Sequence, residues 1–488
     1  MVAPKPRKVF TTEELAGLSH EELVEVVLSQ GSMIELLLAR VERLESEAAR
    51  DSKTSSKPPS ADRQATRAQR AQERSKGTRR RGKQPGDPGH HLRRVDDPDV
   101  TVIHSPGACR CCGGSLEEAP LTGVESRQVF DIPEPKPFVV DHRVQRRRCS
   151  CGAETAGEFP AEAIAPACYG PRLRALAIYM MCRQHLPVER TAELLGDVMG
   201  VTVSTGWLSG LVGQAGTALV PFVAHLAGRL RAEAVIGVDE TGGRVGVAKH
   251  WFHVVTTGRL TLIFAHRRRG MEAVEALGVL PGYGGVIVHD GLALYDGLAD
   301  ATHAQCGAHL LRHLASVGVV WDQTNWTTAM ADLLREANTA AREARLAAKS
   351  CVTAATAASI ASRYDAILDQ AFAGLPDGAP PRLRSAGGGW AEHQRQAWNL
   401  ATRMRNHKPD VLRFLTDTRV PFTNNDSERA LRMVKLQQKI SGNFASEHGA
   451  ENFARIRSYL QTAAGHGQNL HDVLTQLFTT GAWLPAGP

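Results

Sequence analysis

The chain has 488 residues, of which 42% are hydrophobic and 22% are charged, with a formal net charge of +7 at pH 7. This length allows several domains, no apolar run approaches the roughly 18 residues that span a bilayer, and no apolar segment with a cleavage site opens the chain. We therefore expect a cytoplasmic protein without membrane contact, whose nine cysteines are thiols or metal ligands rather than disulfides.

Residues 12–50 are predicted to form a coiled-coil helix. Apolar side chains recur at alternating spacings of four and three, interrupted once by Gln30: Leu23, Val27, Ile34, Leu37, Val41 and Leu44. About three heptads are close to the minimum for a coiled coil. We expect this helix to hold a homodimer or a higher homo-oligomer together; the alternative is that it packs against the chain's own body.

Residues 51–94 form a basic tract rich in Ser, Gly and Pro. It holds thirteen Lys and Arg residues against four Asp and Glu residues, so its excess of positive charge is larger than that of the whole chain. This composition is typical of a disordered linker that binds a polyanion, and phosphate contacts give DNA a sequence-independent affinity. The alternative is a linker that only aids solubility. The predicted DNA contacts are Arg79, Arg80, Arg81 and Lys83.

Residues 95–165 contain two cysteine groups, "CRCCGG" and "RRRCSCG", and are predicted to form a zinc-binding domain. Two cysteine pairs make a tetrahedral four-thiolate site, and two glycines after the first pair suit a tight turn. Cys111 is an alternative ligand to its neighbours, and a set of free thiols is the alternative interpretation. The predicted zinc ligands are Cys109, Cys112, Cys149 and Cys151.

Residues 166–230 are predicted to form a helical, helix-turn-helix-like DNA-binding domain. Pro187 begins one helix and Gly200 ends it. Ser204 or Thr205 caps the next helix, which could enter the major groove. Two packed helices in any α-helical domain would have the same pattern.

Two predicted strands in the C-terminal half end in carboxylates. The apolar run "AEAVIGV" ends in Asp239 and Glu240, and "GGVIVH" ends in Asp290, with two further strands, "HWFHVV" and "LTLIFAHRR", between them. An isolated buried carboxylate is costly, so these acids need a partner. A divalent cation is a natural partner.

The segment "PFTNNDSERALRMVKLQQKISGNF", residues 421–444, begins a helix with a run of capping residues. Glu428, Arg432 and Lys435 then follow at helical spacings of four and three. Together with the two strand acids, Glu428 completes the oxygen-only ligand set that Mg²⁺ prefers, while Arg432 and Lys435 would face phosphates. A salt-bridged surface helix is the alternative.

These segments resemble the insertion-sequence-66 family of bacterial transposases. The similarity rests on "VDET", on "HDGLALYDGL" followed by "CGAHLLRHL", and above all on "NNDSERALRMVKLQQKISGNF"; the "SSKPPS" linker and the cysteine pairs also match. The resemblance implies a ribonuclease H-like catalytic domain in which Asp239, Asp290 and Glu428 hold Mg²⁺ or Mn²⁺. Glu240 and Asp426 become neighbours of this triad, although the residues alone exclude neither as a ligand.

The predicted fold class is therefore multidomain α/β, with the catalytic core in residues 231–475. The 137 residues between Asp290 and Glu428 are more than such a core needs, so we expect a helical insertion over about 322–420. Cys306 and His309 form a C-x-x-H motif for which we favour active-site support over core packing; as a zinc half-site the motif lacks a second pair.

The resemblance implies a DNA transposase that cleaves phosphodiesters at the ends of its element and transfers the freed 3′-hydroxyl to target DNA. Its partners are then double-stranded DNA, at element ends and target, and accessory proteins of the same element, in the bacterial cytoplasm at the nucleoid. A non-catalytic DNA-binding protein derived from a transposase is a second hypothesis, which the presence of all three acids disfavours. A ribonuclease H-like nuclease that only hydrolyses is a third, which a strand-transfer assay distinguishes.

Overall fold

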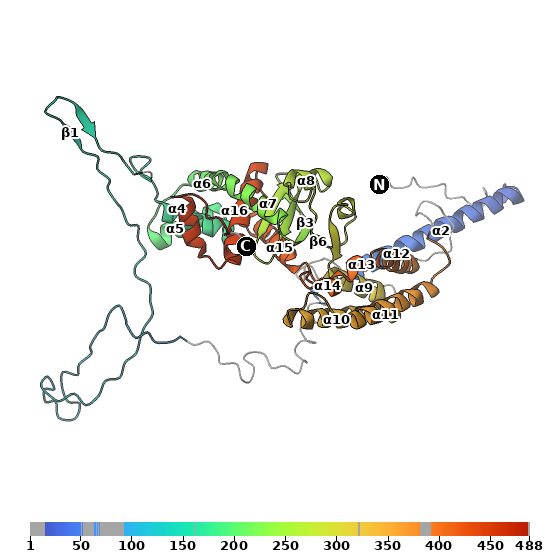
Figure 1. Ribbon diagram of the computed structural model, residues 1–488, viewed down its shortest axis with the longest axis horizontal. Coiled ribbons are helices and arrows are strands. Elements are labelled where there is room, and N and C mark those ends of the chain that lie inside the picture. The colour runs from blue at the N-terminus through green and yellow to red at the C-terminus, as the bar shows by residue number, and fades with distance from the viewer. Residues whose placement is uncertain are drawn as a thin grey trace.

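The computed structural model of the chain describes residues 15–49, 51, 63, 64, 66, 68, 92–160, 162–320, 323–380 and 392–486. Figure 1 shows an elongated molecule, with helix α2 projecting from one end, residues 92–160 projecting from the other, and helices around a sheet between them. The predicted DNA contacts of the basic tract lie outside the described residues: Arg79, Arg80, Arg81 and Lys83.

Helix α2 spans His20–Ala49 and so begins later than the predicted residue 12. Ser19 explains this start, because its backbone N–H and hydroxyl donate to Oε2 of Glu22 at 2.8 Å while Glu22 N–H donates back to the Ser19 hydroxyl oxygen at 3.3 Å. This reciprocal pair is a capping box. Val27 and Leu37 on the predicted seam are more than half exposed, so a row of apolar side chains faces solvent in the single chain.

Residues 92–160, which we call the cysteine arm, contain little regular structure. Strands β1 (Arg146–Arg148) and β2 (Glu154–Ala156) form a short antiparallel hairpin, and a single bridge joins Ala108 to Ser115. None of the arm's residues is buried. Apolar burial drives the folding of small domains. Without buried residues, the polypeptide of the arm has no core that would fix its shape.

The helices after the arm begin and end where the sequence predicts. Helix α5 (Val188–Met199) starts after Pro187 and ends at Gly200, whose φ of 65° suits glycine. Helix α6 (Thr205–Ala218) is capped by Ser204, whose hydroxyl oxygen accepts the Trp207 N–H at 3.1 Å. The same group contains α4 (Pro171–Ile178), the π-helix η2 (Tyr179–Arg183) and α7 (Val220–Arg231).

No described helix is by itself long and apolar enough to cross a membrane, and α6 and α7 reach that length only together, across a 44° bend. Both helices bury apolar side chains in the protein core, including Leu208 and Leu211 of α6 and Leu226 of α7.

A five-stranded sheet with the order β5-β4-β3-β6-β7 forms the centre of the body. Strands β3, β4 and β5 are antiparallel neighbours, while β6 and β7 run parallel to β3. The mixed sheet and its helices confirm the predicted multidomain α/β class. The strands are β3 (Val235–Val245), β4 (Ala248–Thr256), β5 (Thr261–His266), β6 (Val286–His289) and β7 (Thr302–Gln305).

The prediction that the first strand ends at its acids was wrong, because β3 continues to Val245. Its residues from Asp239 onward stay paired with β4. The parallel pairing with β6 stops earlier, at Gly237 opposite Val288. The hairpin with β4 thus continues the strand after β6 has ended, and Asp239 lies in mid-strand beside the end of β6.

The sheet and its helices pack around two hydrophobic cores. Helix α15 (Asn425–Ser441) packs against β3 and β4, α16 (Glu447–Gly465) packs against β5 and α6, and α17 (Leu470–Leu477) packs against α4. A second core lies among helices of the region predicted as an insertion and α9, which precedes it. These are α9 (Gly307–Val320), α10 (Thr324–Leu346), α11 (Ala354–Ala373), α12 (Glu392–Asn406), α13 (Lys408–Val411) and α14 (Arg413–Thr416). The short helices α8 (Met271–Leu277) and η3 (Tyr295–Gly297) lie in the connections between strands.

Candidate functional site

Asp239 of β3 and Asp290, which directly follows β6, lie at matching levels. The register sets Gly237 opposite Val288. Asp239 follows Gly237 by two residues, and Asp290 follows Val288 by two residues. The carboxylate of Asp290 accepts the Leu292 N–H at 2.9 Å, and that of Asp239 accepts the next backbone N–H at 2.8 Å. The place where β3 and β6 stop pairing therefore carries both predicted strand acids.

A buried network of side chains fastens the start of α15 to the sheet. Asn424 Nδ2 donates to the Val238 carbonyl at 2.6 Å, and its Oδ1 accepts the Ser427 hydroxyl at 2.7 Å. The hydroxyls of Ser427 and Thr256 lie 2.7 Å apart. A Cβ at Gly237 would meet Asn424 Oδ1 at 2.3 Å, so glycine allows this close approach. The first turn of α15 is thereby held against the strand that carries Asp239.

The run of capping residues predicted at the start of this helix does not cap it through the side chain at the N-cap. Asn424 occupies the N-cap position, but its side chain makes no capping bond to the helix, because the network uses both of its polar groups. Further along α15, the Lys435 amine donates to the Gly242 carbonyl, and burial followed by the charge of Lys249 lowers the pKa of Lys435. Arg432 is exposed.

Negative charge is concentrated around Asp239. Burial, and then the charges of Glu240, Asp290 and Glu428, raise the pKa of Asp239 to about 8. A buried carboxylate whose pKa is raised by neighbouring acids fits a divalent cation, which relieves both the burial cost and the repulsion. The oxygen donors of Asp239, Asp290 and Glu428 therefore suit Mg²⁺ in chemistry.

Glu428 also contacts helix α9. Its Oε1 accepts Arg312 Nη2 at 2.8 Å and lies 3.6 Å from His309 Nδ1. Within the described part of the chain, one group of three His, Cys, Asp or Glu residues has potential ligand atoms that all lie within 4.8 Å of one another. This group consists of Cys306, His309 and Glu428. The structure thus brings the C-x-x-H motif to Glu428, and burial followed by the charge of Arg312 lowers the pKa of His309.

The two neighbouring acids have different surroundings. The side chain of Glu240 is 1% exposed and accepts Arg269 Nη2 at 2.6 Å and the Tyr295 hydroxyl at 2.7 Å. Asp426 is 58% exposed and lies 3.8 Å from Arg429. Both oxygens of Glu240 are therefore engaged within the protein, whereas Asp426 faces solvent.

Three partners of these acids were not predicted from the sequence: Arg269, Tyr295 and Arg312. They meet Glu240 and Glu428 across separations of 29, 55 and 116 residues, which no local pattern reveals. The spacing of Arg312 three residues after His309 was the one available signal, because it sets both on one side of a helix.

Two histidines support the turn that carries Asp290. His289 Nδ1 accepts the Gly291 N–H at 3.2 Å, so its Nε2 holds the proton and donates to His303 Nδ1 at 3.2 Å. His303 Nε2 then donates to the Leu298 carbonyl at 3.3 Å. Burial, and then the neighbouring His303, lower the pKa of His289 to about 3, so this chain of bonds holds a neutral imidazole.

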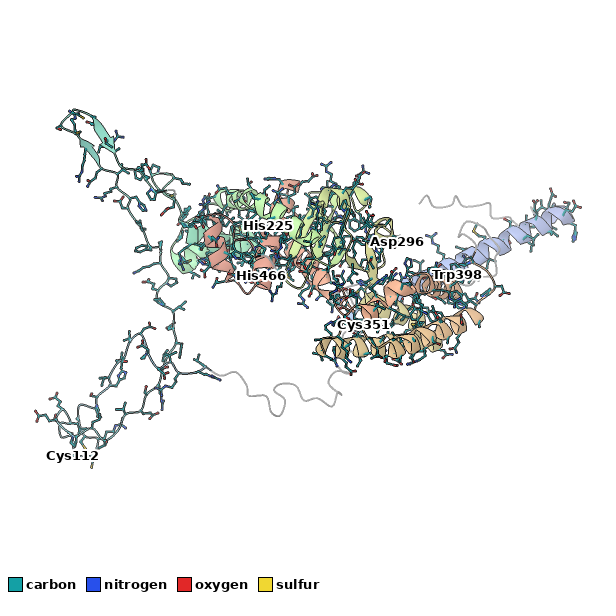
Figure 2. The ribbon with its side chains drawn as sticks, viewed as in Figure 1. Cys112, His225, Asp296, Cys351, Trp398 and His466 are labelled. Carbon is teal, nitrogen blue, oxygen red and sulfur yellow. The ribbon has the colours of Figure 1, made fainter. Side chains whose placement is uncertain are left out.

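The cysteine arm forms two similar turns, one at each cysteine pair. Gly113 N–H donates to the Cys109 carbonyl and Gly152 N–H to the Cys149 carbonyl, both at 2.9 Å. In each pair the N–H of the second cysteine lowers the pKa of the first thiol, which favours the thiolate that zinc binds. Figure 2 places Cys112 at one tip of the arm, whereas Figure 1 places β1, which leads into the second pair, at another. The structure forms both halves of the predicted zinc site but does not join them.

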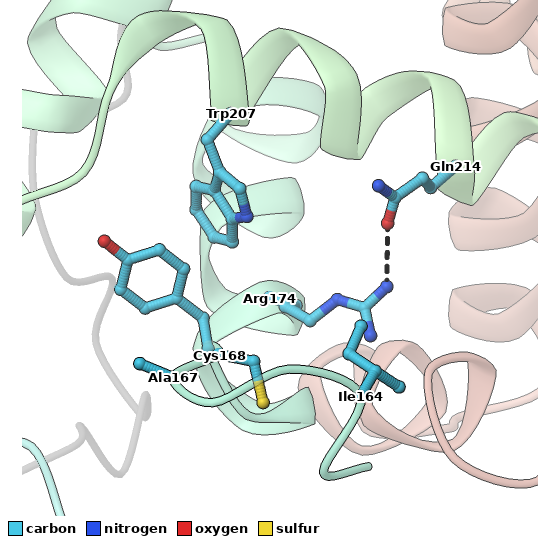
Figure 3. A pocket seen from close by; sticks show the side chains of 7 residues that line it. Ile164, Ala167, Cys168, Arg174, Trp207 and Gln214 are labelled. Atoms are coloured by element: carbon cyan, nitrogen blue, oxygen red, sulfur yellow. Dashed lines mark hydrogen bonds between the residues drawn. The ribbon is translucent and has the colours of Figure 1, made fainter. Parts of the chain in front are cut away.

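A hollow of about 380 Å³ lies away from these acids, between α4, α6 and the segment before α4. Figure 3 shows Arg174 extending across it to Gln214, with Trp207 and Cys168 on its walls. Arg174 Nη2 donates to Gln214 at 2.9 Å and its guanidinium lies 4.3 Å from the Phe478 ring centre. The arginine is thus engaged by the protein itself.

Comparison with known proteins adds three family matches. The "Transposase IS66 family" matches residues 166–452, more than half of the chain, including all three predicted catalytic acids. The "zinc-finger binding domain of transposase IS66" matches residues 106–152, including the four predicted zinc ligands, and a "Family of unknown function (DUF6444)" matches residues 2–93. The chain is also 24% identical over 404 residues to "Uncharacterized protein y4hP" of Sinorhizobium fredii (strain NBRC 101917 / NGR234), covering 74% of this chain and 68% of that protein.

Proposed function

The chain belongs to the IS66 family of transposases, and from this premise we propose that it cleaves DNA at the ends of its own element and joins the freed ends to target DNA. Family membership makes it a DNA-binding, DNA-processing enzyme with a zinc-finger domain. The further proposal is that the chemistry is of the Asp-Asp-Glu type on a ribonuclease H-like core.

The observation that carries this proposal is the β3–β6 register, which sets Asp239 beside Asp290, together with the Asn424 bonds that hold the start of α15, which carries Glu428, against β3. Burial, and then neighbouring acids that include Asp290 and Glu428, raise the pKa of Asp239, so the charges of all three acids are felt at Asp239. A protein gains nothing in stability from crowding acids in this way. The arrangement is therefore best explained by a cation that the acids bind in the working enzyme.

We assign Asp239, Asp290 and Glu428 as the residues that would hold Mg²⁺ or Mn²⁺. Two such ions, when bound, activate the attacking oxygen and stabilise the leaving oxygen of a phosphodiester. The chain itself sets the geometry: the β3–β6 register aligns the two aspartates, and the Asn424 network holds the first turn of α15 against β3.

Basic side chains near the acids supply the proposed phosphate contacts. Arg432 is exposed on α15 and is free to meet a DNA backbone. Lys435 bonds to the Gly242 carbonyl and must leave it to serve as a second contact. Arg312 neutralises Glu428 at 2.8 Å, so it must yield this carboxylate when the cation binds.

The remaining domains are proposed to position DNA and to assemble the enzyme. We assign residues 95–165 to zinc binding through Cys109, Cys112, Cys149 and Cys151, and 166–230 to helix-turn-helix-like DNA binding. Residues 231–475 form the catalytic domain with its helical insertion. The exposed apolar row of α2 supports a coiled coil between two copies of the chain. Changing Leu37 and Val41 to Lys should therefore lower the mass of the protein measured by light scattering. An unchanged mass would show that α2 is not the contact between copies.

The proposed chemistry is tested by substituting the acids one at a time. Glu428→Gln keeps the shape of the side chain and removes its charge, so it should abolish both cleavage of element ends and transfer of a 3′-hydroxyl to target DNA. Asp239→Asn and Asp290→Asn should do the same, and the double variants should add little because the three act as a unit. DNA binding and folding should remain.

Asp426→Asn is the matched control, because Asp426 lies two residues before Glu428, faces solvent and has no close partner among the described residues beyond Arg429. It should retain activity. If Glu428→Gln is active and Asp426→Asn is inactive, the third acid of the site is Asp426 and not Glu428. Cleavage without strand transfer in the unmodified enzyme would instead support a nuclease.

A further inference from the structure

A second set of potential metal ligands meets at the contact between α9 and α15. Cys306 lies immediately before α9, His309 is in its first turn and Glu428 is in the first turn of α15; their ligand atoms are within 4.8 Å of one another. The set consists of one thiol, one imidazole and one carboxylate. Mg²⁺ takes oxygen ligands, whereas Zn²⁺ takes all three donor types and uses three protein ligands in open sites.

The surroundings of the cluster fit a metal better than they fit a finished hydrogen-bond network. His309 Nδ1 is buried and has no hydrogen-bond partner among the described residues, which is an expensive state for a polar atom. Cys306 is fully buried, and its sulfur accepts the Asn424 N–H at 3.1 Å. A backbone N–H directed at the sulfur supports a bound thiolate, as outer-shell bonds do in metal sites.

We propose that Cys306, His309 and Glu428 bind a Zn²⁺ ion, separate from the zinc of the cysteine arm, and that this ion withdraws Glu428 from Asp239 and Asp290. The existence of the site is independent of the proposed catalysis; its effect on activity rests on the proposed function. Zinc at this site is then an inhibitor that acts by taking one carboxylate away from the other two.

Arg312 is the competitor of zinc at this site. Its Nη2 lies 2.8 Å from the Glu428 oxygen that also faces His309, and its side chain is 24% exposed, so it can turn toward solvent when a metal takes that oxygen. Three cations therefore compete for Glu428: the guanidinium of Arg312, zinc beside Cys306 and His309, and magnesium beside Asp239 and Asp290.

The first test measures cobalt binding to the full chain, because Co²⁺ takes zinc sites and its absorption reports thiolate ligands. Protein stripped of zinc should bind about two Co²⁺ ions that have thiolate ligands, one in the arm and one at Cys306. Cys306→Ser can still accept the Asn424 N–H but cannot supply a thiolate, so it should bind about one. Cys351→Ser is the matched control, because Cys351 is exposed between α10 and α11, and it should bind the same number as the unmodified chain.

Arg312→Gln tests the same site in the opposite direction. Removing the competing charge should raise the affinity for the second Co²⁺ roughly tenfold, a gain that misfolding cannot produce. Equal cobalt binding by the unmodified chain and Cys306→Ser, or no gain in Arg312→Gln, would overturn the site.

Added Zn²⁺ should then inhibit magnesium-dependent DNA cleavage more strongly in Arg312→Gln than in the unmodified enzyme. A second cobalt ion with no cleavage under any condition would preserve this site and remove the proposed function. Cleavage that Zn²⁺ leaves unchanged while the second site is filled would remove the inhibitory role.

Discussion

The cysteine arm and the carboxylate site place their proposed metal ligands in opposite ways. In the arm, hydrogen bonds within each turn order one cysteine pair at a time, and no residue of 92–160 is buried. At the carboxylate site, strand register aligns Asp239 and Asp290, and the buried bonds of Asn424 hold the start of α15, which carries Glu428, against β3. Burial fixes long-range geometry, whereas a segment without a core leaves that task to the metal.

The largest expected effect is the loss of the arm's structure when zinc is removed. Structural zinc contributes about 10–16 kcal/mol in zinc-finger peptides at pH 7, and the arm has no apolar core to replace that contribution. Chelation should abolish hydrogen-exchange protection in residues 106–152 and leave protection in β3 and β6 unchanged. Equal protection of the arm with and without zinc would show that the protein part alone orders it.

A smaller effect is expected from adding a methyl group at the contact between β3 and the start of α15. In Gly237→Ala the new Cβ would meet Asn424 Oδ1 at 2.3 Å and Ser427 Oγ at 2.8 Å, so the start of α15 must shift. Overpacking of this kind costs about 1–3 kcal/mol, measurable by urea unfolding, and cleavage should fall further because Glu428 moves with the helix.

Gly258→Ala is the control for this change, because nothing lies within 4 Å of a Cβ built there. It should leave stability and cleavage nearly unchanged. If Gly237→Ala behaves like this control, the carboxylate site is less tightly built than its buried bonds indicate, and the contrast with the arm weakens.

A third effect is the pH dependence that Asp239 adds to stability in protein that holds zinc only in the cysteine arm and no magnesium. Its pKa is raised from 3.8 to about 8, so between these values the folded state binds more protons than the unfolded state. Stability must therefore fall as pH rises from about 4 to about 8. Thermal unfolding should show this fall in the unmodified protein and a shallower one in Asp239→Asn; equal slopes would mean that the carboxylate is ionised without cost.

Local signals predicted much of the fold because they act over a few residues. Pro187, Gly200 and Ser204 bound α5 and α6 as expected, and turn residues separated β4 from β5. The continuation of β3 past Asp239 was missed because it depends on pairing with β4, which no composition signal reports. The start of α2 was missed although Ser19 and Glu22 form a recognisable capping pair.

The acids of the proposed site have local signals in the sequence, whereas their contacts with distant partners have none. Asp239 and Asp290 follow apolar runs, and Glu428 follows a helix start, so each has a local signal. Arg312 and Tyr295 meet these acids only through the packing of distant elements. The use of Asn424 as a clamp on Val238 rather than as a cap likewise depends on the sheet beneath α15.

The central claim, that Asp239, Asp290 and Glu428 act as one cation site, is tested most directly by Mn²⁺ binding measured with electron paramagnetic resonance on protein that holds zinc only in the cysteine arm. The account predicts that Asp239→Asn, Asp290→Asn and Glu428→Gln each lose most of the Mn²⁺ bound by the unmodified chain, while Asp426→Asn keeps it. Mn²⁺ binding that survives Glu428→Gln but not Asp239→Asn would contradict the claim and leave Glu428 as the partner of Arg312 alone.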